Sequence, residues 1–108
     1  MQTAINRSQN GYTARTEVTV GGHVLVFVSK KHGGCLVTSV STAKIEGDFL
    51  VTSPGLFKTL RITKAKRIGQ RFIEKEHANA LAMYADQCVE ELKTVLHPDP
   101  VSSTQPLP

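Results

Sequence analysis

Between Gly55 and Phe72 the sequence carries six basic residues and no acid. They are Lys58, Arg61, Lys64, Lys66, Arg67 and Arg71. Clustered lysine and arginine side chains attract phosphate groups, because each contact neutralises charge and releases bound counterions. The next segment of the chain is acidic: residues 74–99 contain six acids and two lysines, a net charge of −4. The whole chain carries a net charge of +4. Three interpretations are open here, namely an ordinary solvated face, an anion-binding patch and a patch for a membrane surface.

The histidines and cysteines raise the question of a metal site. His32 and Cys35 are separated by two glycines, a spacing that zinc sites use. A structural zinc site needs four ligands, and Cys88 and His97 are too scattered along the chain to complete one. The sequence therefore predicts a glycine turn beside a strand cysteine, with no metal and no cofactor.

The sequence gives little support for a catalytic site that uses acid–base or nucleophilic chemistry. Glu74 and His77 are three residues apart and can meet on a helix, but such pairs are common on exposed first turns. General acid–base catalysis also needs a pocket and a shifted pKa. The serines Ser39, Ser41 and Ser53 lack the context of a nucleophile elbow. We therefore predict no catalytic residues and no enzyme, and we interpret His77 as a packed histidine.

The expected location follows from cysteine usage and hydropathy. The two cysteines, Cys35 and Cys88, do not form a disulfide framework and resemble small buried apolar residues. No signal-peptide pattern opens the chain, and no run approaches the ~18 apolar residues of a membrane span. The sequence thus predicts a cytoplasmic protein without a membrane partner.

The first half of the chain alternates between apolar and polar residues, as strands do. We expect strands over residues 12–20, 23–29, 35–45, 49–53 and 56–63, separated by turns rich in glycine or proline. The second half changes to steps of three and four. His77, Ala80, Leu81, Tyr84, Cys88, Leu92 and Val95 mark one face of a helix over about 73–96. Pro98 ends it, and its start is open between Thr63 and Ile73.

The predicted fold class is α+β, an antiparallel β-meander of four to five strands followed by one long C-terminal helix packed on the sheet. We expect a flexible N-terminus over residues 1–11 and a single α+β domain over 12–96. Residues 97–108 hold four of the five prolines and are expected to form a disordered tail. Because Val24 to Val28 are apolar on both faces of their strand, one helix cannot cover the sheet. Closure into a barrel or a partner chain would solve this, and we predict a homodimer.

The basic run itself is expected to be a strand with two faces. We predict that Leu60 and Ile62 face the helix, in one row with Lys58, Lys64 and Lys66. The other face, with Thr59, Arg61, Thr63 and Arg67, would then be open to solvent. Alternate residues on a strand are roughly 7 Å apart, similar to the phosphate spacing of a single nucleic-acid strand. Phe57 or Phe72 could stack a base if it is exposed.

Two functions fit these observations. The first is a small non-enzymatic nucleic-acid-binding protein whose basic patch, Lys58 to Arg71, contacts phosphates of single- or double-stranded nucleic acid. The alternative is a protein-binding adaptor or inhibitor, for example one encoded by a phage or plasmid, which docks the same patch on an acidic surface of its target. Salt-dependent binding to bare nucleic acid would distinguish the two.

Overall fold

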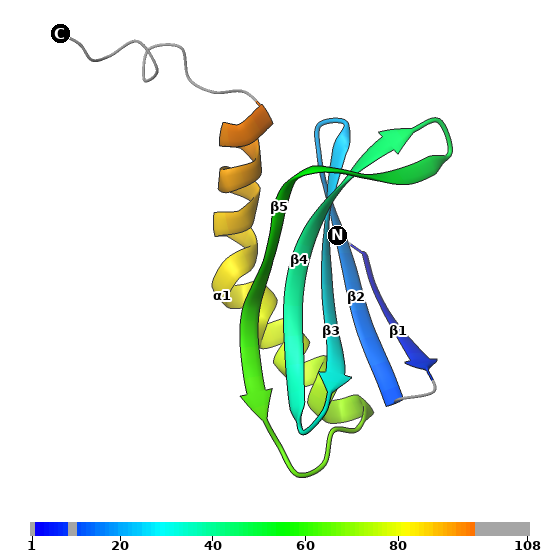
Figure 1. Cartoon of the computed structure of the whole chain (residues 1–108), viewed down its shortest axis with the longest axis vertical. Helices are drawn as coiled ribbons and strands as arrows, with labels where there is room; N and C mark the ends of the chain where they lie inside the picture. Colours follow the sequence, from blue (N-terminus) through cyan, green and yellow to red (C-terminus); the bar gives the residue numbers. More distant parts are fainter. Residues whose placement is uncertain (1, 9–10, 97–108) are drawn as a thin grey trace, which may run out of the picture.

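The computed structural model describes residues 2–8 and 11–96, which form one antiparallel sheet and one helix (Figure 1). The elements are β1 (Gln2–Ser8), β2 (Gly11–Val20), β3 (His23–His32), β4 (Cys35–Glu46), β5 (Phe49–Lys64) and α1 (Gln70–Leu96). The strands lie in the sheet in the order of the sequence, and each pairs antiparallel with its neighbours. The helix covers one face of this sheet. The predicted α+β meander with one packed C-terminal helix is therefore confirmed.

The tight turns use glycines for their backbone geometry. Gly21 and Gly33, in the turns after β2 and β3, have φ angles of 62° and 65°. Side chains rarely adopt such angles, whereas glycine does so without steric cost. These turns fix the registers of the hairpins, including Val20 opposite His23 and His32 opposite Cys35.

The start of the chain differs from the expected flexible N-terminus. β1 pairs with β2 over seven residues, from Gln2 opposite Glu17 to Ser8 opposite Gly11. Ile5 packs against a small cluster that includes Leu36 and Ile73. The polar sequence of this segment hides the strand, because backbone pairing rather than an apolar face holds most of it in place.

The fourth and fifth expected strands are one strand. Ser53–Gly55 was expected to reverse the chain, but residues 49–64 continue as β5. Ser41 pairs with Phe57 and Ala43 with Thr52, so residues 53–56 form an irregularity in the ladder instead of a turn. Proline is tolerated there because β5 is an edge strand and needs no donor on its free side.

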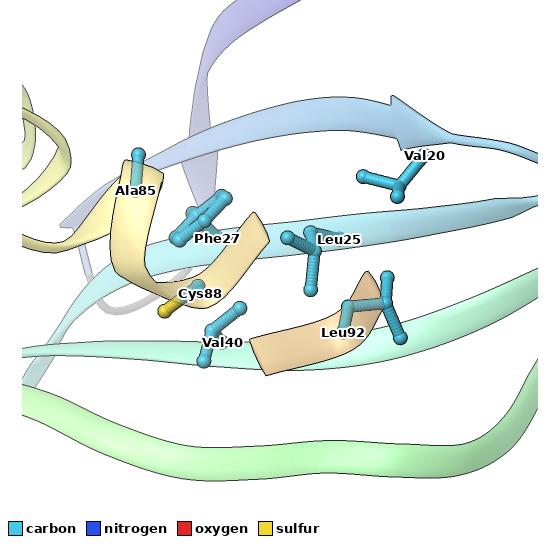
Figure 2. Packing of buried hydrophobic residues seen from close by; sticks show 7 residues of the cluster. All are labelled: Val20, Leu25, Phe27, Val40, Ala85, Cys88 and Leu92. Carbon is cyan, nitrogen blue, oxygen red and sulfur yellow. The ribbon is translucent and has the colours of Figure 1, made fainter. Parts of the chain in front are cut away.

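One apolar cluster joins α1 to the sheet (Figure 2). It contains Val20, Leu25, Phe27 and Val40 from the strands and Ala85, Cys88 and Leu92 from the helix. The predicted helix stripe is confirmed for its buried members, but Val95 is exposed. The helix begins at Gln70, within the range left open between Thr63 and Ile73, and the Gly69 carbonyl accepts a hydrogen bond from Ile73 N–H at 3.0 Å.

The face opposite the helix has a small core of its own. Val24, Val26 and Ala43 are buried there, with Val28 packed against them. Past the irregularity in β5, the β4–β5 hairpin extends beyond the body of the sheet (Figure 1). We call this extension the arm, and its exposed apolar side chains are Ile45, Phe49, Leu50 and Val51. Part of the sheet face opposite the helix is thus buried by residues of the same chain. The apolar side chains of the arm remain exposed.

Candidate nucleic-acid interface

A one-residue irregularity in β5 decides where the basic run points. β4 pairs Thr38 with Arg61 but the next residue, Ser39, with Thr59, so Leu60 is an extra residue in the ladder. The bulge shifts the alternation of side chains between the two faces of the sheet by one residue. The Arg61 side chain therefore points to the helix side. Ile62 then faces away from the helix and is 63% exposed. The predicted face was therefore right for Lys58 and Leu60. It was wrong from Arg61 to Lys64, because Lys64 pairs with Cys35 on the face away from the helix.

Two of the six predicted site residues are paired with acids of the helix. Arg61 forms an ion pair with Glu76 at 3.1 Å, and the Glu76 side chain is only 10% exposed. Thr63 donates a hydrogen bond to the same carboxylate at 3.3 Å. Lys58 Nζ lies 2.8 and 2.9 Å from the two carboxylate oxygens of Glu91. The hydrogen bond with Glu91 raises the pKa of Lys58 above its usual value. Lys58 and Arg61 therefore hold α1 on β5 and are not free to bind an anion in this arrangement.

The other four predicted residues are exposed, and two further lysines join them. Lys64, Lys66, Arg67 and Arg71 lie at the end of β5, in the connection to the helix and in its first turn. Lys30 and Lys31, near the end of β3, are also exposed. All three segments come together at one end of the molecule (Figure 1), where Ala65 N–H donates a hydrogen bond to Gly34 O at 3.2 Å. We call these six residues the basic end.

Lys30 and Lys31 were missing from the predicted site. They are adjacent in the sequence to the "HGG" turn, about 30 residues before the rest of the cluster. The signal that could have found them is the hairpin register: Lys31 pairs with Leu36, which in turn pairs with Thr63. Combining the two hairpins places the end of β3 two strands from Lys64.

The helix adds to the positive potential of this end. The N-terminus of a helix carries a partial positive charge, and acids in the first turn normally complement it. The first turn of α1 contains no acid and instead carries Arg71. A cation in this position costs roughly 0.3–1 kcal/mol unless an anion is bound nearby. The local electrostatics of the basic end therefore favour an anionic partner.

A hollow opens within the basic end. It has a volume of about 430 Å³ and is lined by Gly34, Cys35, Lys64, Ala65 and Lys66. The hollow is shallow and open to solvent, and its lining is mostly apolar, so it is a surface depression and not an enclosed ligand site. Lys64 and Lys66 contribute to its rim, and both are exposed.

A chain of hydroxyl groups surrounds His77, which is 2% exposed. Its Nε2 lies 2.7 Å from Thr16 Oγ1, and its Nδ1 lies 2.7 Å from Ser29 Oγ. Ser29 Oγ lies 2.6 Å from Thr38 Oγ1, and Thr16 Oγ1 lies 2.7 Å from Thr3 Oγ1. A neutral imidazole has one donor and one acceptor, so each ring nitrogen can be satisfied by a hydroxyl.

This network is structural. His77 was predicted as a packed histidine, and its burial confirms that, but the sequence did not indicate its hydroxyl partners. A serine beside a histidine resembles a nucleophile–base pair, yet Ser29 has no exposed surface from which a substrate could be reached. Burial lowers the pKa of His77 below its usual value, which keeps the ring neutral at pH 7.

His32 and Cys35, the pair considered as metal ligands, lie opposite each other across the β3–β4 turn. Within residues 2–8 and 11–96, no three histidine, cysteine or acidic side chains lie close enough together to hold a metal ion. Cys35 is half-buried and Cys88 is buried, and both are free thiols.

Comparison with known proteins adds no functional assignment. No family model matches the chain, and neither curated proteins nor solved structures gave a match. In the part of the chain that the structure describes, no helix is long and apolar enough to cross a membrane.

Proposed function

We propose that this protein is a non-enzymatic nucleic-acid-binding protein that contacts phosphates through its basic end. The observation that carries this proposal is the meeting of six exposed cations from three separate segments at the positive end of α1. Phosphate contacts from lysine and arginine supply most of the affinity of non-specific nucleic-acid binding. Lys58 and Arg61, although part of the same basic run, act mainly by holding the helix on the sheet.

Charge reversal at the basic end is expected to weaken binding by tenfold or more at moderate salt. The variant is Lys66→Glu with Arg67→Glu. Both residues are exposed and form no ion pair within the described part of the chain, so stability should stay within about 0.5 kcal/mol. Each lost contact should also flatten the plot of log affinity against log salt, by about 0.7 for a single strand or 0.9 for a duplex. Fluorescence anisotropy of a labelled oligonucleotide at several salt concentrations measures both effects.

The matched control is Lys44→Glu with Lys93→Glu, which changes the net charge equally at exposed residues outside the basic end. It should leave the salt dependence close to that of wild type. Equal weakening in both variants would contradict a local site, because only net charge would then matter. Absence of salt-dependent binding by the wild type would refute the proposed function itself.

The second candidate function is a protein-binding adaptor or inhibitor that docks the basic end on an acidic target surface. The exposed apolar side chains of the arm favour it, since contiguous exposed apolar residues are typical of protein interfaces. This candidate is supported if the wild type fails to bind nucleic acid while remaining folded.

We also propose that the protein is a homodimer. The apolar second face around Val24 and Val26 is already buried within the chain, whereas the apolar side chains of the arm are exposed and would gain most from a partner. In a twofold dimer the same patch meets itself, and the apolar residues of two arms would cover one another. Light scattering at micromolar concentration is expected to give about twice the 11.8 kDa of one chain. A mass near 11.8 kDa would contradict the dimer.

A further inference from the structure

Phe57 is an exposed aromatic ring on the open face of the sheet. It is 86% exposed, the highest value among the large hydrophobic residues of the described chain. Its strand partner is Ser41, on the face opposite the helix. Phe72, the other aromatic residue considered for base stacking, packs against a core cluster and is not available. The condition for stacking on Phe57, exposure to solvent, is therefore met.

The open face of β5 connects Phe57 to the basic end. After the bulge at Leu60, this face carries Ile62 and then Lys64, whose partner Cys35 lines the hollow. Because Leu60 is an extra residue, Phe57 and Lys64 are as far apart as six regular strand residues, about 20 Å, or roughly three steps of the 7 Å that separates alternate residues. An extended chain of a few nucleotides matches this length.

The chemistry along this path suits a nucleic-acid strand. The β4 residues beside it include Ser41 and Ser39, whose hydroxyls can reach phosphates or sugars, and Lys30 of β3 lies beyond Val37 on the same face. The open-face positions of β4 and β5 between Phe57 and Lys64 carry no acid. Charge and exposed aromatic surface are thus complementary to a polyanion with accessible bases.

Single-stranded nucleic acid is the form that can contact both the Phe57 ring and the lysines of the basic end. Bases in a duplex are paired and stacked on one another, so an aromatic side chain on a sheet can reach only an unpaired base. We propose that a single strand lies along the open face of β5, with its phosphates beside Lys64 and Lys66 and a base stacked on Phe57. This inference rests on the proposed function and names the class of nucleic acid that the basic end binds.

The test compares Phe57→Ala with Phe49→Ala, which removes another exposed ring, 75% exposed, from the arm, outside the proposed path. The probes are a 12-nucleotide oligo-dT strand and a 12-base-pair duplex, each labelled for anisotropy. Because one stacked base contributes about 1–3 kcal/mol, Phe57→Ala is expected to weaken oligo-dT binding roughly 5- to 150-fold. Phe57→Trp should retain binding, Phe49→Ala should resemble wild type, and the duplex affinity should not depend on residue 57.

The outcomes separate the inference from the proposed function. Suppose that wild type binds both probes in a salt-dependent manner and that Phe57→Ala binds oligo-dT as wild type does. Base stacking on Phe57 is then wrong, while phosphate binding by the basic end is retained. Failure of wild type to bind either probe overturns both. Light scattering compares the mass of Phe57→Ala with that of wild type. If the substitution converts a dimer to a monomer, a second copy of the chain covers this face, and the inference is overturned.

Discussion

Replacement of His77 by alanine is expected to lower the free energy of unfolding by about 3 kcal/mol at pH 7. The change removes a buried ring and leaves the hydroxyls of Thr16 and Ser29 without their partner at the centre of the helix–sheet interface. Urea denaturation followed by circular dichroism measures the loss. Lys75→Ala, an exposed position on the same helical turn, is the control and should stay within about 0.5 kcal/mol of wild type.

The same residue predicts how stability depends on pH. The pKa of His77 is lower in the folded protein than its value of 6.5 in an exposed histidine, because burial disfavours the charged ring. The unfolded chain therefore takes up a proton first as pH falls, so this contribution to stability is complete above about 6.5 and is lost progressively below it. The alanine variant should lack that part of the pH dependence. An identical dependence in both proteins would show that His77 is already accessible and protonates freely in the folded state.

Arg61→Glu is expected to destabilise the protein by about 2–3 kcal/mol, whereas Arg67→Glu should change stability little. Arg61 pairs with Glu76, whose carboxylate is largely buried, so reversal of its charge places two carboxylates together beneath the helix. Loss of one partner of a fully buried pair costs about 3–5 kcal/mol, and the partial exposure of Arg61 reduces that figure. Urea midpoints of the two variants give the comparison.

A charge swap tests whether the pair itself is responsible. The double variant Arg61→Glu with Glu76→Arg should recover part of the stability lost by Arg61→Glu alone, because the two groups can pair again. If Arg61→Glu is as stable as wild type and instead reduces nucleic-acid binding, the ion pair is not formed in solution. Arg61 would then belong to the binding surface, as the sequence first suggested.

Hydrophobic periodicity was sufficient to predict the main elements. The stripe from His77 to Leu92 predicted the helix and the face it buries, because a period of 3.6 residues is distinctive over a long segment. Glycine pairs marked the hairpin turns after β2 and β3. β2, β3 and β4 follow from these two signals, and sequential antiparallel pairing is the simplest way to connect them. β1 does not, because its sequence is polar, and the turn expected at residues 53–55 lies within β5.

The positions of the basic side chains could not be predicted from the same patterns. A period of two continues unchanged only while a strand is regular, and the extra residue at Leu60 exchanges the faces of Arg61 and Ile62. No residue type in "KTLRIT" signals that bulge. Lys30 and Lys31, which are distant in the sequence, lie at the basic end because of the registers of the β3–β4 and β4–β5 hairpins. Side-chain periodicity alone does not give these registers.

The strictly sequential strand order has a consequence for biosynthesis. Every strand pairs with the strand made just before it, so the hairpins can form one after another as the chain leaves the ribosome. α1, however, is translated after all five strands. Until it emerges, Leu25, Phe27 and Val40 present an uncovered apolar face on a growing sheet. The interval before the helix docks is therefore the period in which nascent chains are most exposed to aggregation and to capture by chaperones.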